Sequence, residues 1–206
     1  MAAAAAVAGR RGGAASSCGI TLVELLFALA VAVTVLTMAI PEGLRARDEY
    51  RTRAAAQYLA SRLGQARLSA IRRSRFVGLR FESSSGEYAF RSVEDGNING
   101  LKTAEILAGT DPTVTAPERL ETKFAGVAFG ILTGVPDADG QPVDSSDGVR
   151  VGSAGILSMN PNGSSSSGTV YVHGRERSQY AVRVLGATGR VRVLKYAEPL
   201  ARWVEQ

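Results

Sequence analysis

The chain contains few of the residues from which enzyme and metal sites are commonly built. Its 206 residues include one cysteine, Cys18, one histidine, His173, and one tryptophan. A single cysteine excludes an intrachain disulfide and leaves no second thiolate for a cysteine-based zinc site. A Ser-His-Asp arrangement would have to use His173, and no phosphate-binding loop of the Walker type occurs. We therefore predict that the protein is not an enzyme, that it needs no cofactor, and that core packing stabilises its fold.

Charged side chains are almost absent between Ile20 and Ile40, where Glu24 is the single ionisable residue. As a helix this segment would be about 31 Å long, which matches the hydrocarbon core of a bilayer. A carboxylate inside that core costs roughly 2.5–3.5 kcal/mol on insertion scales. A cation on a neighbouring molecule would offset this cost. The segment therefore predicts a transmembrane helix that pairs with other helices through Glu24.

Three other interpretations of the apolar segment compete with this one. It could be a cleavable secretory signal with Thr37-Met38-Ala39 as its small-residue cleavage site. Glu24 argues against that, because an acid rarely interrupts the apolar region of such a signal. A single-span anchor without a role in assembly is the second alternative. A lipoprotein signal at Cys18 does not fit, because the apolar run follows the cysteine instead of preceding it.

The following segment is basic and has the composition of a helix. From Glu42 to Arg75 there are nine arginines and three acids, and no proline occurs between Arg45 and Arg73. Pro41 and Gly43 predict a bend or a melted turn where the chain leaves the membrane. Apolar residues recur at three- and four-residue steps, which predicts an amphipathic helix that packs on a sheet. This predicted stripe consists of Tyr50, Ala54, Tyr58 or Leu59, Leu63, Ala66, Ala70 and Ile71.

Strand patterns occupy most of the remaining chain. Val77 to Phe81 alternates apolar and polar residues, 83–86 predicts a turn, and Glu87 to Val93 predicts the returning strand. Polar loops are expected at 94–117 and 136–148. A long N-terminal helix followed by antiparallel strands predicts an α+β fold. Further strands are predicted at 124–132, 149–151, 155–159, 169–173, 181–185 and 190–194.

The segment from Gly19 to Glu24, Gly-Ile-Thr-Leu-Val-Glu, resembles the class III signal of type IV pilins and pseudopilins, usually Gly-Phe-Thr-Leu-Ile-Glu. Ile20 stands where the family usually has Phe or Met, and Pro41 falls where many pilins carry a kinking proline. The resemblance to the GspH/FimT branch of the pseudopilins extends through the chain to about Lys195. The segments that carry it are Ala66–Arg73, Phe76–Phe81, Asn160–Gly163, Thr169–Val172 and Gly189–Val193.

The resemblance implies that a prepilin peptidase cuts after Gly19, that the new amine of Ile20 is N-methylated, and that Glu24 neutralises the terminal amine of an adjacent subunit. It implies a minor pseudopilin of a type II secretion pseudopilus or a type IV pilus, with other pilins and the peptidase/methyltransferase as partners. The expected parts are a cleaved leader at 1–19, a transmembrane helix at 20–40, an amphipathic helix at 41–75, a sheet domain at 76–195 and a tail at 196–206.

The expected location is the bacterial inner membrane, crossed once, with the sheet domain in the periplasm. This orientation conflicts with the positive-inside rule. Arg45, Arg47, Arg51 and Arg53 after the apolar run outnumber Arg10 and Arg11 before it. We nevertheless predict it, because the peptidase site has to face the cytoplasm.

The last predicted hairpin brings arginines together. If Gly186–Gly189 is its loop, Arg183 faces Arg192, and such like charges destabilise a sheet unless an anion or solvent separates them. Arg190 and Arg192 share a face and suit phosphate oxygens. On the FimT side of the family a Gly-Arg-x-Arg motif, which Gly189-Arg190-Val191-Arg192 fits, is associated with DNA binding during uptake. A DNA-binding pilus-tip subunit is therefore the second hypothesis, and a solvated edge hairpin is the alternative.

The segment from Asp95 to Gly100 matches the first half of a calcium loop, with oxygen-bearing residues at Asp95, Asn97 and Asn99. The twelfth position of that loop would be Ile106 instead of an acid, although Glu105 and Asp111 are near in sequence. We therefore predict a polar turn in preference to a calcium site. A second acidic group, still weaker as a candidate, consists of Asp137, Asp139, Asp144 and Asp147.

Overall fold

The computed structural model describes residues 21–84, 86–144 and 147–206. The chain divides into two compact units, one ending at Glu42 and one from Gly43 to Gln206. Helix α1, Leu22–Arg73, is continuous through Pro41 and Gly43, so the predicted melted turn is wrong. Good helix formers flank both residues, and the single hydrogen bond lost at a proline does not end the helix here. Gly19 and Ile20 lie outside the described residues.

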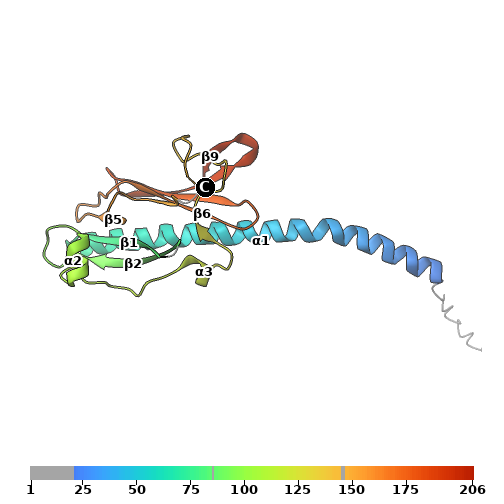
Figure 1. Cartoon of the computed structure of the whole chain (residues 1–206), viewed down its shortest axis with the longest axis horizontal. Coiled ribbons are helices and arrows are strands. Elements are labelled where there is room, and N and C mark those ends of the chain that lie inside the picture. The colour runs from blue at the N-terminus through green and yellow to red at the C-terminus, as the bar shows by residue number, and fades with distance from the viewer. Residues whose placement is uncertain (1–20, 85, 145–146) are drawn as a thin grey trace, which may run out of the picture. The chain divides into compact units, whose positions relative to one another are not determined.

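The second unit contains two antiparallel sheets, which lie alongside the C-terminal part of α1 (Figure 1). The first has the order β2-β1-β5, from Glu87–Glu94, Val77–Ser84 and Ile156–Met159. The second has the order β3-β6-β7-β8-β9, with β4 also paired to β6. Its strands are β3 (Ala128–Phe129), β4 (Val149–Arg150), β6 (Gly168–His173), β7 (Gln179–Leu185), β8 (Arg190–Ala197) and β9 (Arg202–Glu205). The α+β fold class is confirmed.

The main core forms where α1 packs against both sheets. Leu59, Leu63, Ala66 and Ala70 are buried there with Val77, Leu79, Val182 and Val184, among others, as the predicted stripe requires. The ends of that stripe are wrong, because Tyr50 is 75% and Ile71 44% exposed. Near the expected start of the stripe, the buried face of α1 instead carries two polar residues, Asp48 and Thr52.

A smaller core covers the outer face of the second sheet. Ile131 and Val135 pack there against Tyr171 and Ala181. The strand predicted at 124–132 is therefore wrong except at Ala128–Phe129, and a short helix, α3 (Leu120–Lys123), precedes it. Gly126, Gly130 and Gly134 adopt positive φ angles, which interrupt an extended strand and let the segment wrap over the sheet.

Three further elements lie in segments where the sequence showed no regular structure. Helix α2, Thr103–Ala108, lies within the predicted loop 94–117. After β8, the 3₁₀ turn η1 (Glu198–Leu200) leads into β9, which pairs with β8. The C-terminal segment thus adds the edge strand of the second sheet.

Candidate functional site

Thr21 directly precedes α1, and its side chain binds the backbone of Glu24. The N–H of Glu24 donates to the Thr21 hydroxyl at 3.2 Å, and the N–H of Leu25 donates to the Thr21 carbonyl at 3.1 Å. This is half of a capping box, Thr-x-x-Glu, and a carboxylate in the first turn also interacts favourably with the helix dipole. Thr21 therefore caps the helix, and the place of Glu24 in the first turn favours the helix through its charge alone. The Thr-x-x-Glu spacing at residues 21–24 is the sequence signal for this cap.

The apolar side chains that follow have no cover within the described chain. Leu22 is 75%, Phe27 72% and Met38 78% exposed. The helix is long and apolar enough to cross a membrane, judged by length and composition. Contiguous apolar surface of this size is unfavourable in water. The segment therefore requires apolar surroundings, which a bilayer or the helices of other subunits would supply.

The arginine hairpin has the predicted register. Leu185 pairs with Arg190, Val184 with Val191, and Arg183 with Arg192. The expected repulsion between these arginines is offset by acids from other segments of the chain, whose proximity the sequence did not predict. Arg183 pairs with Asp139 at 2.8 Å. Arg190 and Arg192 share the carboxylate of Glu205 on β9, at 3.4 and 3.5 Å.

The arginine cluster, defined as Arg183, Arg190 and Arg192, keeps an unused hydrogen-bonding capacity. Its three positive charges face two carboxylates. The Nε of Arg192 is buried without a hydrogen-bond partner among the described residues. Both acids are well exposed, 64% for Asp139 and 44% for Glu205, and exposed ion pairs contribute little to stability. An anion can therefore compete with them for the arginines.

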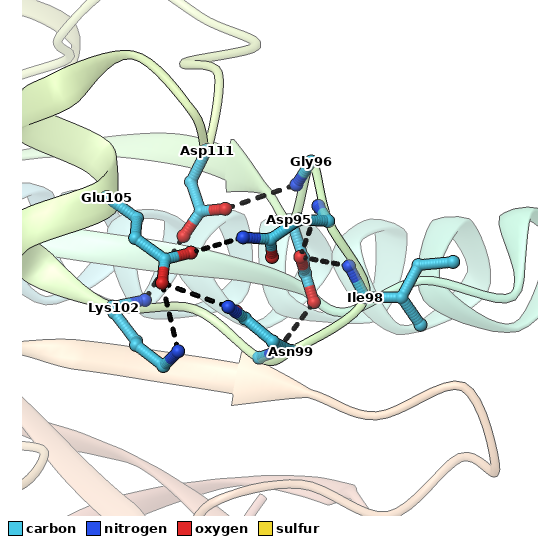
Figure 2. Close-up of polar contacts among 9 residues, drawn as sticks. Asp95, Gly96, Ile98, Asn99, Lys102, Glu105 and Asp111 are labelled. Carbon is cyan, nitrogen blue, oxygen red and sulfur yellow. Dashed lines mark hydrogen bonds and ion pairs between the residues drawn. The ribbon is translucent and has the colours of Figure 1, made fainter.

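Asp95 and Asp111 organise the predicted calcium segment by binding its backbone N–H groups (Figure 2). Both side chains are fully buried. Asp95 accepts hydrogen bonds from the N–H groups of Asn97, Ile98 and Gly100 at 2.7–2.9 Å. Asp111 accepts from the N–H groups of Gly96 and Lys102 at 3.1 and 3.2 Å. The two carboxylates thus hold the loop by its backbone.

The remaining polar side chains of this loop converge on Glu105. The amide groups of Asn97 and Asn99 donate to it at 2.8 and 2.9 Å, and Lys102 pairs with it at 2.9 Å. These hydrogen bonds, that of Lys102 first, lower the pKa of Glu105 below its ordinary value. The sequence-predicted residues Asp95, Asn97 and Asn99 therefore do come together, but N–H donors occupy their neighbourhood. Over 21–84, 86–144 and 147–206, no group of three or more His, Cys, Asp or Glu side chains could hold a metal ion.

The second acidic group is divided among arginines. Asp137 binds Arg150 at 2.6 Å and Asp139 binds Arg183, while Asp147 is 3.3 Å from Arg150. The histidine on which an enzyme site would depend, His173, is half-buried, with its Nδ1 3.0 Å from the carbonyl oxygen of Gly174. Neither arrangement resembles a catalytic or metal site.

Comparison with known families identifies the second unit. The family model for type II transport protein GspH matches residues 55–189, well over half of the chain. No curated protein and no solved structure matches. The matched stretch begins after the apolar part of α1 and ends one residue before Arg190, so it includes neither Glu24 nor the arginines of β8. On this match the chain belongs to the GspH family of type II transport proteins.

Proposed function

We propose that this protein is a minor pseudopilin that is processed at Gly19 and assembled through its N-terminal helix. Membership of the GspH family supports a pseudopilin-like role in type II secretion or in a type IV pilus. The observation that carries the finer proposal is the uncovered apolar face of α1 up to Ile40, beside the single carboxylate of Glu24. A helix of this kind is stable in a bilayer alone and in a bundle with other such helices.

The proposed maturation begins with cleavage after Gly19 by a prepilin peptidase and methylation of the new amine of Ile20. In the assembled filament, Glu24 pairs with the terminal amine of a neighbouring subunit. That pairing replaces a costly isolated carboxylate by an ion pair in apolar surroundings. The chain would reside in the bacterial inner membrane before assembly, with its sheet domain in the periplasm.

Mass spectrometry of the mature N-terminus tests the processing step. The expected product starts at methylated Ile20. A product that starts at Ile40 would instead mean that the apolar run is a cleaved secretory signal, and an uncleaved chain would mean a simple anchor.

The assembly step is tested with three variants of the first helical turn. Glu24→Gln keeps the side-chain length but removes the charge, and Glu24→Ala removes the polar side chain, while both keep the backbone N–H that binds Thr21. Thr21→Ala removes the cap and keeps the charge. If intersubunit pairing recruits the protein, both Glu24 variants are lost from sheared filaments, while Thr21→Ala is retained. Retention of Glu24→Gln at the native level contradicts the proposed pairing.

Binding of DNA by the arginine cluster is the second candidate function. The surplus positive charge of three arginines against two carboxylates favours it, because phosphate groups would neutralise that charge. We expect Arg190→Ala/Arg192→Ala to abolish the retardation of duplex DNA in a gel shift. The matched control is Arg119→Ala, an exposed arginine paired with Glu87 outside this cluster. Equal retardation by the double variant and the native chain rules out this function.

A further inference from the structure

The hairpin of β8 and β9 ends in an exposed apolar tip. Pro199 and Leu200 lie in the turn η1, and Leu200 is 57% exposed. Ala201 follows with a positive φ of 45°. Turns in contact with water are usually built from Gly, Pro, Asn, Asp and Ser, so Leu200 is the unusual residue here. One exposed leucine is ordinary on a protein surface, so the argument depends on what surrounds it.

Two aromatic residues stand directly behind the tip. Tyr196 and Trp203 face each other across β8 and β9, with ring centroids 5.5 Å apart, and both are half-buried. The indole N–H of Trp203 donates to the carbonyl oxygen of Pro136 at 3.1 Å. Tyrosine and tryptophan of this kind, apolar in body and polar at one end, are enriched where proteins meet the membrane–water interface.

A groove beside the tip carries charges of both signs. Its volume is about 500 Å³, and Leu200 and Tyr196 contribute to its lining. Arg177 pairs across the groove wall with Glu198 at 2.9 Å, and Lys195 contacts Glu49 of α1. Because the charged residues of the lining balance, the groove suits a ligand that has both a phosphate and an ammonium group. These residues are Arg45, Arg177 and Lys195 against Glu49, Glu176 and Glu198.

The groove is tied by the chain to the end of the apolar run. Arg45, which lines it, follows Ile40 by five residues. Five residues span at most about 18 Å even when fully extended. The polar layer on each side of a bilayer core is itself roughly 5–8 Å thick. This bound comes from chain length alone, so it holds for any arrangement of the two units.

We propose that the tip of the β8–β9 hairpin docks into the phospholipid headgroup layer of the membrane that α1 crosses. Pro199 and Leu200 enter the apolar edge of that layer, Tyr196 and Trp203 lie at the interface, and the groove receives zwitterionic headgroups. This inference rests on the proposed membrane insertion of α1.

Trp203 is the only tryptophan of the chain, so its fluorescence reports on the tip alone. The full chain is reconstituted into vesicles of zwitterionic phosphatidylcholine, with or without bromine atoms high on the acyl chains. We expect brominated lipid to quench Trp203 and Leu200→Asp to lose more than half of that quenching. The matched control is Leu107→Asp, a 73% exposed leucine on α2, which should be quenched like the native chain. Equal melting temperatures establish that both variants fold.

Flotation and alkaline extraction distinguish the docking of the tip from the membrane insertion of α1 on which it rests. A chain that stays with the vesicles, yet shows Trp203 unquenched by lipid and open to iodide, overturns the docking and leaves membrane insertion intact. Trp203 is half-buried within the domain itself, so protection from iodide is compared with that of the chain in detergent. Greater protection than in detergent, without lipid quenching, would mean that a second copy covers the tip, and this also overturns the docking. Quenching of Leu200→Asp at the native level does the same. A chain that fails to float overturns both proposals.

Discussion

At the scale of single residues, buried carboxylates in this protein are compensated by backbone N–H groups. Asp48 accepts from Arg175 and Glu176 at 2.9 Å, Asp95 from three N–H groups, and Asp111 from two. A buried carboxylate without partners would be costly, but hydrogen bonds of this kind offset the cost. Asp48 therefore links two segments that are distant in sequence, whereas Asp95 and Asp111 hold the backbone of one local loop.

Replacing Asp95 by asparagine tests this role. Asp95→Asn should lower the free energy of unfolding by about 1.5–3 kcal/mol, because the new amide group turns a donor toward an N–H that needs an acceptor. The matched control is Glu87→Gln, whose exposed pairing with Arg119 should contribute less than about 1 kcal/mol. Urea unfolding of both variants measures the difference. Equal loss in the two variants would contradict the role assigned to Asp95.

The same hydrogen bonds lead to a prediction about calcium. Calcium takes six to eight oxygen ligands, whereas the carboxylate oxygens of Asp95 and Asp111 already accept N–H bonds. Millimolar calcium should therefore leave the melting temperature unchanged, as measured by thermal unfolding with calcium and with a chelator. A calcium-dependent rise in melting temperature that is lost in Asp95→Asn would contradict this prediction and show that the loop binds calcium.

At the scale of elements, one contact joins α1, near the start of the second unit, to the turn between β6 and β7. The carboxylate of Asp48 caps two N–H groups of that turn, and Gly174 lies directly against it. A Cβ at Gly174 would fall 2.5 Å from both the Asp48 Oδ1 and the Thr52 hydroxyl. Only glycine permits this approach.

Gly174→Ala should therefore destabilise the domain by about 1–3 kcal/mol, as overpacking of a tight contact does. Gly64→Ala is the opposite control: nothing lies within 4 Å of the position of its Cβ, and α1 is helical there. It should stabilise by about 0.5–1 kcal/mol. Chemical unfolding of both variants checks the pair, and a stable Gly174→Ala chain would show that the turn moves freely from α1.

Elements governed by neighbouring residues could be predicted from the sequence, and those governed by distant ones could not. The β7–β8 register followed from the Gly186–Gly189 turn and from alternation. The pairing of β1 with β5 joins Leu79 to Leu157, and no local pattern encodes it. For the same reason, no local pattern predicts Glu205 as the partner of Arg190. At α1, Asp48 was not expected to be buried, since its partners are 127 and 128 residues away.

At the scale of the whole molecule, acid should weaken the domain through at least two carboxylates. Glu118 is bound by Tyr58, by Lys123 at 2.6 Å and by Arg62 at 2.8 Å. Partial burial alone would raise its pKa, but these hydrogen bonds and charges outweigh it, so the pKa lies below its ordinary value. Burial alone would also raise the pKa of Asp137. Hydrogen bonds from the N–H groups of Gln141 and Asp139, together with Arg150, outweigh this effect and lower the pKa.

A carboxyl group whose pKa is lower in the folded chain stabilises that chain above its ordinary pKa. The stability that Glu118 and Asp137 contribute should therefore be present above their ordinary values of 4.5 and 3.8 and be lost as the pH falls below them. Melting temperatures recorded from neutral to strongly acidic pH measure the effect. Glu118→Gln and Asp137→Asn should flatten the curve, while Glu87→Gln should not. A native curve that is flat through this range would contradict the prediction.

Glu205 should weaken the binding of DNA to the arginine cluster. This carboxylate holds both Arg190 and Arg192, so it competes with phosphate for the same guanidinium groups. Glu205→Gln removes the competing charge and should tighten DNA binding by up to about fivefold, the equivalent of one surface ion pair. Arg190→Ala/Arg192→Ala should reduce the slope of log affinity against log salt by about 2 units. Fluorescence anisotropy with labelled duplex over a salt series measures both.

If Glu205→Gln binds no more tightly than the native chain while the double variant still loses binding, the arginines contact DNA without competition from β9. If neither variant changes affinity, the cluster is a solvated edge whose charges Asp139 and Glu205 balance.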